Sequence, residues 1–113
     1  MGFCIKQSDT YVWPVSVKLP TNGGRYDTQT FDVEFRRVSQ ARIEELLEQG
    51  RSAEINDRAV CGELVAGWQG ITDGTGEVPF SDAAFRQLLD IPGIQAAIIA
   101  AWFESLSGEK RKN

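Results

Sequence analysis

Two cysteines and a surplus of carboxylates are the side chains of this 113-residue chain whose types could support chemistry. Histidine is absent, which excludes Ser-His-Asp and Cys-His catalysis and any histidine-containing zinc site. Cys4 and Cys61 do not form a CxxC pair, and two thiols are too few for a four-thiolate metal site. We expect both cysteines to be buried and reduced.

The carboxylates do not form a recognisable catalytic pattern. Most fall on predicted solvent-facing helix surfaces (Glu44, Glu45, Glu48, Glu54, Asp57 and Glu63), whereas glycoside hydrolysis needs two carboxyl groups held across a cleft. The run Asp73-Gly74-Thr75-Gly76-Glu77 lacks the ligand spacing of an EF-hand and is typical of a plain turn. Asn22-Gly23-Gly24 is not followed by Lys-Ser/Thr, so no phosphate-binding loop is indicated. We expect no enzymatic activity, no cofactor and no metal.

The charge balance argues against a nucleic-acid partner. The net charge is −4, whereas duplex-binding domains carry a surplus of Lys and Arg on one face. The basic run Lys110-Arg111-Lys112 follows Gly108, and we expect residues 108–113 to be a flexible basic tail.

Length and composition predict one globular domain over residues 1–107. The longest apolar stretch, Gln95–Phe103, is shorter than the ~20 residues that span a bilayer. The first residues lack the basic and apolar segments of a signal peptide. We therefore expect a cytoplasmic protein with no membrane partner.

Two runs of alternating apolar and polar residues predict a β-hairpin near the N-terminus. The apolar positions are Tyr11, Trp13, Val15, Val17 and Leu19 in the first run and Phe31, Val33 and Phe35 in the second. Asn22-Gly23-Gly24 supplies the turn, because glycine readily adopts positive φ. Phe3-Cys4-Ile5 is a candidate third strand. Pro14 lacks an N–H, so its side of the strand should face an edge or a bulge.

Helix-start signals recur at three places, where Ser39, Asn56 or Asp57, and Ser81 can cap a helix. Val38 with Ile43, and Phe80 with Phe85, have the spacing of a hydrophobic staple. We expect the first two helices to end at Gly50 and Gly67, the third at Asp90 or Ile91, and Pro92 to lie in the first turn of the last. The sequence thus predicts an α+β domain, with an N-terminal antiparallel β-hairpin or three-stranded sheet followed by about four short α-helices.

The segment Gly67–Pro79 reads as a loop or small hairpin with Trp68 and Ile71 as apolar anchors. The last helix is apolar on nearly every side, so it is either central to the core or partly an interface. Trp102 and Phe103 cannot both point inward unless the helix is surrounded, and one of them is the candidate partner contact. We expect a partner-binding or self-association surface drawn from Trp68, Ile98, Trp102, Phe103 and Leu106.

The order of motifs resembles that of the tail assembly chaperones of long-tailed bacteriophages and prophages. The motifs are Trp13-Pro14-Val15, the strand Phe31 to Arg37, Gly67 to Ile71, Val78 to Ser81, Leu88 to Gly93 and a terminal Phe-x-x-Leu helix. The resemblance spans residues ~11–106, about the size of one domain, and its most specific part is Gly67 to Gly93.

The resemblance implies a non-enzymatic factor of the host bacterial cytoplasm that is absent from the mature virion. Such proteins bind the tape measure protein, keep it soluble and help to recruit the tail tube protein, and many are made in two lengths by ribosomal frameshifting. A virion component, such as a tail terminator or head–tail joining protein, is the alternative within the same setting. A small acidic hydrolase is the alternative from another class.

Overall fold

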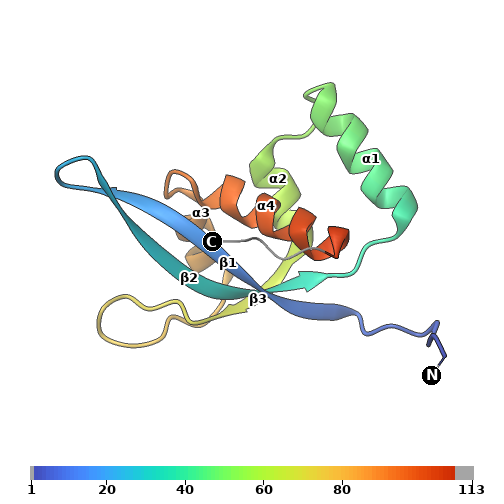
Figure 1. The fold of residues 1–113 in the computed structure, drawn as a ribbon, viewed down its shortest axis with the longest axis horizontal. Helices are drawn as coiled ribbons and strands as arrows, with labels where there is room; N and C mark the ends of the chain where they lie inside the picture. The colour runs from blue at the N-terminus through green and yellow to red at the C-terminus, as the bar shows by residue number, and fades with distance from the viewer. Residues whose placement is uncertain (1, 109–113) are drawn as a thin grey trace.

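The computed structural model describes residues 2–108 and contains a three-stranded antiparallel sheet and four helices (Figure 1). The elements follow the order β1 (Thr10–Thr21), β2 (Arg25–Arg36), α1 (Gln40–Arg51), α2 (Asp57–Leu64), β3 (Val65–Gln69), α3 (Asp82–Leu89) and α4 (Ile94–Ser107). The predicted α+β class is confirmed. The expected tail lies outside the described residues except for Gly108, which ends α4 in a left-handed conformation.

The β1–β2 hairpin forms as the alternating pattern predicts. Val15 lies opposite Phe31, and Asn22-Gly23-Gly24 forms the turn, with both glycines at positive φ. The odd-numbered side chains of β1 face the helices, and Val15 and Val17 are buried. The even-numbered side chains lie on the opposite face, which is exposed to solvent.

The third strand is not the one expected. β3 pairs with β2 through Val33 opposite Trp68, so the sheet order is β1-β2-β3. Phe3-Cys4-Ile5 instead lies in an irregular N-terminal segment with exposed side chains. The prediction failed because β3 is only five residues long and follows α2 without a turn signal. The sequence therefore assigns its first residues to the end of a helix and the rest to the segment that starts at Gly67.

The starts of α1, α2 and α3 are confirmed, whereas the start of α4 and some of the helix ends are corrected. Ser39, Asn56 and Ser81 accept hydrogen bonds from the backbone N–H three residues later. α1 continues past Gly50 to Arg51, and α2 ends at Leu64 rather than Gly67. α3 ends at Leu89 with Asp90 as its C-cap, in line with the prediction, but Gly93 is the N-cap of α4 and Pro92 lies before the helix.

The core lies between one face of the sheet and the helices α2, α3 and α4. Its largest fully buried side chains are Trp102, Phe35, Leu64, Ile98, Val15, Val33 and Cys61. α1 stands beside this body (Figure 1) and buries Leu46. Arg42 of α1 joins Glu63 of α2 through two parallel bonds, Nε to Oε2 at 2.6 Å and Nη2 to Oε1 at 2.5 Å. Such charge-assisted pairs fix orientation well, and this one holds α1 to α2.

No helix within residues 2–108 has the length and apolar character needed to cross a membrane.

Candidate functional site

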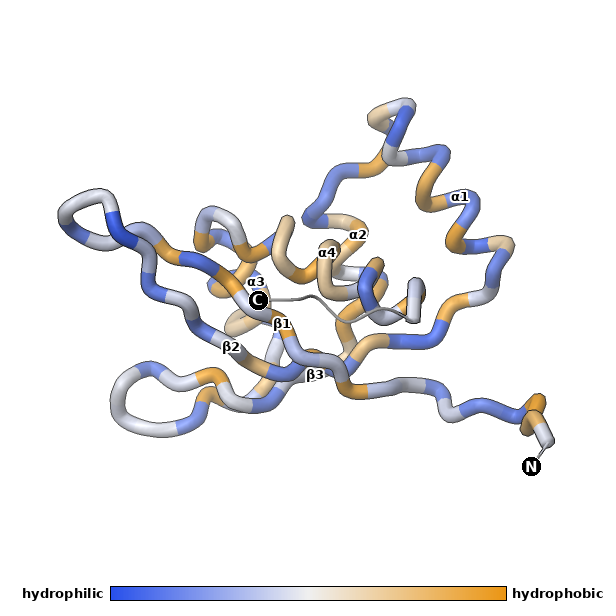
Figure 2. The backbone as a smooth tube through the Cα atoms, in the orientation of Figure 1, coloured by the Kyte–Doolittle hydropathy of each residue, from blue (hydrophilic) through white to orange (hydrophobic). Residues whose placement is uncertain are grey.

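Helix α4 carries two apolar stripes, and in Figure 2 it is coloured hydrophobic or near neutral along most of its length. The inner stripe is buried and consists of Ile94, Ile98, Ala101 and Trp102. The outer stripe consists of Ala96, Ile99, Phe103 and Leu106. Steps of three, four and three residues place these four side chains on one face of a helix. Because the inner stripe already packs into the core, the outer stripe is available to contact a partner.

The inner stripe packs over β1 and α2, and polar contacts fix its position. The hydroxyl oxygen of Tyr11 in β1 lies 2.7 Å from Ser105 Oγ. Ser105 Oγ also lies 2.6 Å from the Trp102 carbonyl oxygen. Since the Ser105 hydroxyl donates to that carbonyl, the Tyr11 hydroxyl donates to Ser105. The Cys61 thiol of α2 points at the Gln95 carbonyl, with an Sγ–O distance of 3.8 Å. The orientation of α4, and hence of its outer stripe, is therefore set by the body of the protein.

The outer stripe exposes Ala96 at its start and the large side chains Phe103 and Leu106 at its end. Ile99 is half-buried, Phe103 is 42% exposed and Leu106 is 45% exposed. The Phe103 ring packs against the Trp102 ring with a centroid distance of 5.2 Å and an interplanar angle of 52°. This contact limits the conformational freedom of the Phe103 side chain before any partner binds. Two adjacent large apolar side chains held on a fixed helix make a surface suited to another apolar helix.

The structure does not bring the five predicted surface residues together. Ile98 and Trp102 are buried in the core at 0% and 2% exposure, so their side chains are not available to a partner in this fold. Phe103 and Leu106 are exposed neighbours on α4. Trp68 belongs to a different part of the molecule, on β3.

Trp68 packs into an aromatic cluster with Phe80, which precedes α3, and Phe85 of α3. Its ring lies edge-on to Phe80 at 4.9 Å and tilted to Phe85 at 6.4 Å. Phe80 and Phe85 lie 5.5 Å apart, which confirms the predicted staple. The indole N–H donates to the Val78 carbonyl at 2.8 Å, which ties β3 to the loop before α3.

A groove that sequence reasoning missed runs beside this cluster. We call it the hairpin groove; it has a volume of about 420 Å³ and is lined mainly by Trp68, Ile71, Asp73, Val78, Leu88 and Ile91. The segment between β3 and α3 forms a small hairpin closed by a bridge between Thr72 and Glu77. The signal for the groove was the apolar Ile71 and Val78 on either side of a polar turn.

The turn of this hairpin is organised by one carboxylate. Asp73 Oδ1 accepts hydrogen bonds from the Thr75 N–H at 2.9 Å, the Thr75 hydroxyl at 2.6 Å and the Gly76 N–H at 3.2 Å. These bonds, chiefly that from the Thr75 side chain, lower the pKa of Asp73. The rim of the hairpin groove therefore carries a fixed negative charge.

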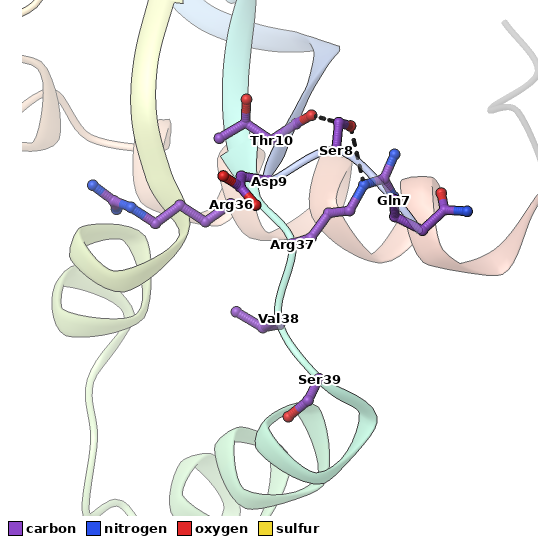
Figure 3. Close-up of a pocket in the computed structure, with 8 residues that line it drawn as sticks. All are labelled: Gln7, Ser8, Asp9, Thr10, Arg36, Arg37, Val38 and Ser39. Carbon is purple, nitrogen blue, oxygen red and sulfur yellow. Dashed lines mark hydrogen bonds between the residues drawn. The ribbon is translucent and has the colours of Figure 1, made fainter. Parts of the chain in front are cut away.

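A second depression, of about 580 Å³, lies where the N-terminal segment meets the end of β2 and the start of α1 (Figure 3). Its two arginines point in different directions. Arg36 donates to the carbonyls of Glu63 at 3.1 Å and Val65 at 2.8 Å. Arg37 donates to Ser8 Oγ at 3.4 Å and lies 4.8 Å from the centre of the Tyr11 ring. Arg36 thus connects β2 to the end of α2 and the start of β3, and Arg37 contacts the N-terminal segment and β1. Both guanidinium groups in the depression therefore have a structural role.

The two cysteines differ, which corrects the expectation that both are buried. Cys61 is buried, and desolvation, together with the charge of Asp57, raises the pKa of its thiol to about 12. Cys4 is exposed. Within residues 2–108, no three Cys, Asp or Glu side chains gather closely enough to hold a metal ion.

The chain matches no protein-family model, and no curated protein or solved structure is significantly similar to it. The resemblance to tail assembly chaperones accordingly rests on the sequence motifs, and the surfaces of the fold must supply the physical argument for function.

Proposed function

We propose that this protein is a phage or prophage tail assembly chaperone that binds the tape measure protein and helps to recruit the tail tube protein. It acts without catalysis or cofactor in the host bacterial cytoplasm and is left out of the mature virion. The observation that carries the proposal is the outer stripe of α4, where Phe103 and Leu106 are exposed on a helix whose other face is already buried. The motif order from Trp13 to Leu106 supports it independently.

The outer stripe suits a helical client. A tape measure protein presents long amphipathic helices until the tail tube encloses them, and their apolar faces need temporary cover. The three-four-three spacing of Ala96, Ile99, Phe103 and Leu106 is the spacing with which one helix packs along another. The net charge of −4 limits association with nucleic acid during assembly.

Co-expression with an amphipathic tape measure fragment tests the proposal. The double variant Phe103→Ser with Leu106→Ser should fold normally but leave the fragment insoluble, because the client loses its apolar contact. Tyr26→Ser is the matched control, since Tyr26 is an exposed aromatic residue of the β1–β2 hairpin. A fragment that stays equally soluble with the double variant would remove the outer stripe from the proposal.

A second experiment separates an assembly factor from a virion component. Mass spectrometry of purified phage particles should find the tape measure and tail tube proteins but not this chain. Its stoichiometric presence in the particles would favour a tail terminator or head–tail joining role instead.

A further inference from the structure

The N-terminal arm, defined as residues 2–7, carries two large apolar side chains with almost no cover. Phe3 is 89% exposed and Ile5 is 91% exposed. Within the described chain, the side-chain hydrogen bonds of the arm stay inside it, from Gln7 Nε2 to the Cys4 carbonyl at 2.7 Å and from Cys4 Sγ to the Lys6 carbonyl at 3.4 Å. Apolar groups presented this openly are typical of a contact with another surface.

The base of the arm is fixed even though its apolar side chains are uncovered. The Arg37 N–H donates to the Asp9 carbonyl at 2.9 Å, and the Ser8 hydroxyl donates to the Thr10 carbonyl at 2.7 Å. The Arg37 side chain also reaches Ser8 (Figure 3). The arm therefore leaves the sheet in a defined direction, and its six residues reach about 20 Å when extended.

The hairpin groove complements the arm both in apolar surface and in charge. Part of its wall is apolar (Trp68, Ile71, Val78 and Leu88), Ile91 at its edge is 39% exposed, and Asp73 at its rim is charged. The arm bends at Ile5 in the isolated chain. When residues 3–6 are extended, Phe3 and Ile5 lie on the same side, and Lys6 follows them. The arm contains no acidic residue. The apolar side chains thus match the apolar part of the wall, and the lysine matches the carboxylate.

The arm of one molecule does not lie near the groove of the same molecule. The arm projects from the end of the sheet opposite α3 and the hairpin that precedes it (Figure 1), and the longest dimension of the protein is 48 Å. We propose that the N-terminal arm of one copy docks in the hairpin groove of a second copy, with Phe3 and Ile5 against the apolar wall and Lys6 beside Asp73. Repeated head to tail, this contact forms a ring or a filament, and made reciprocally it forms a dimer. It uses no residue of the outer stripe of α4, so it leaves that stripe free.

Sedimentation over a range of concentrations tests the contact. The wild-type chain should associate. The arm variant Phe3→Ser with Ile5→Ser and the groove variant Ile91→Asp should each raise the dissociation constant at least tenfold. Gln87→Arg is a second groove variant at an exposed lining position, and it should also weaken association. Tyr26→Ser is the control and should behave as wild type. A wild-type monomer at every concentration, or unchanged association of the arm variant, would overturn the proposal.

A mixing experiment distinguishes arm-in-groove docking from other modes of association. The arm variant keeps an intact groove and the groove variant keeps an intact arm, so an equimolar mixture should associate at least tenfold more tightly than either variant alone. No gain on mixing would contradict the proposal.

Cross-linking decides whether the contact lies between chains. Cys4 is exposed, and Thr72→Cys places a second exposed thiol at the groove. A short bismaleimide should join Cys4 of an isotope-labelled chain to the new thiol of an unlabelled chain, and the wild-type chain gives the background from Cys4 alone. Links confined to single chains would show that the arm folds back on its own body, against the proposal.

Discussion

The inner and outer stripes of α4 have similar composition and opposite surroundings. Ile98 and Trp102 are sealed between the sheet and α2, whereas Phe103 and Leu106 lie open to solvent. Trp102 and Phe103 are consecutive residues, and their rings touch. The difference teaches that apolar character alone does not assign a residue of such a helix to the core or to a surface. Substitutions at the two stripes should therefore separate folding from partner binding.

The largest effect is expected from Trp102→Ala. Removing a fully buried indole leaves a cavity and should lower the free energy of unfolding by about 3–5 kcal/mol. Urea denaturation followed by circular dichroism measures the change. A loss below about 1 kcal/mol would mean that the inner stripe is not the packed face.

A smaller effect on stability is expected from Phe103→Ala. Because the ring is 42% exposed in the folded state, the loss in unfolding free energy should stay below about 1 kcal/mol. The same denaturation experiment checks it beside Trp102→Ala. If both variants lose equal stability, the two stripes do not differ as the structure indicates.

Much of the fold was predictable because its signals are local. The alternation from Tyr11 to Leu19, the turn at Asn22-Gly23-Gly24 and the caps at Ser39 and Ser81 each act within a few residues. Short-range chemistry of this kind can be read without knowing the tertiary structure.

β3 and the surfaces were not predictable in the same way. Val65–Gln69 is a strand because β2 offers it a pairing edge, which is a long-range cause. The aromatic pattern alone could not decide which of Trp102 and Phe103 is buried in the core. The positions of β1 and α2 determine which side of α4 faces inward. The hairpin groove depends on α3 packing beside the segment that the sequence predicts as a loop or small hairpin, and this packing is a long-range contact.

A modest, pH-dependent effect is expected from Glu63→Gln. The Arg42 guanidinium lowers the pKa of Glu63 in the folded state, so the pair stabilises the fold above the ordinary pKa of a carboxyl group. That stabilisation is lost as the pH falls through the lowered value. The variant should melt at a lower temperature than wild type at pH 7, and the gap should close in acid. Glu54→Gln, at an exposed carboxylate, is the control. A gap that persists unchanged at low pH would assign the loss to packing rather than charge.

The smallest perturbation, thiol labelling, leaves the fold intact and reports on the inner stripe directly. At pH 8 Cys4 should react with a maleimide at once, because it is exposed. Cys61 should react only when α2 and α4 separate, because burial raises the pKa of its thiol to about 12 and places it against Gln95 of α4. Trp102→Ala should speed the labelling of Cys61, whereas Phe103→Ala should leave it unchanged, and mass spectrometry of the labelled peptides measures both. Equal acceleration by the two variants would show that opening of the α2–α4 contact depends on the outer stripe as well, and the division of α4 into a folding face and a binding face would fail.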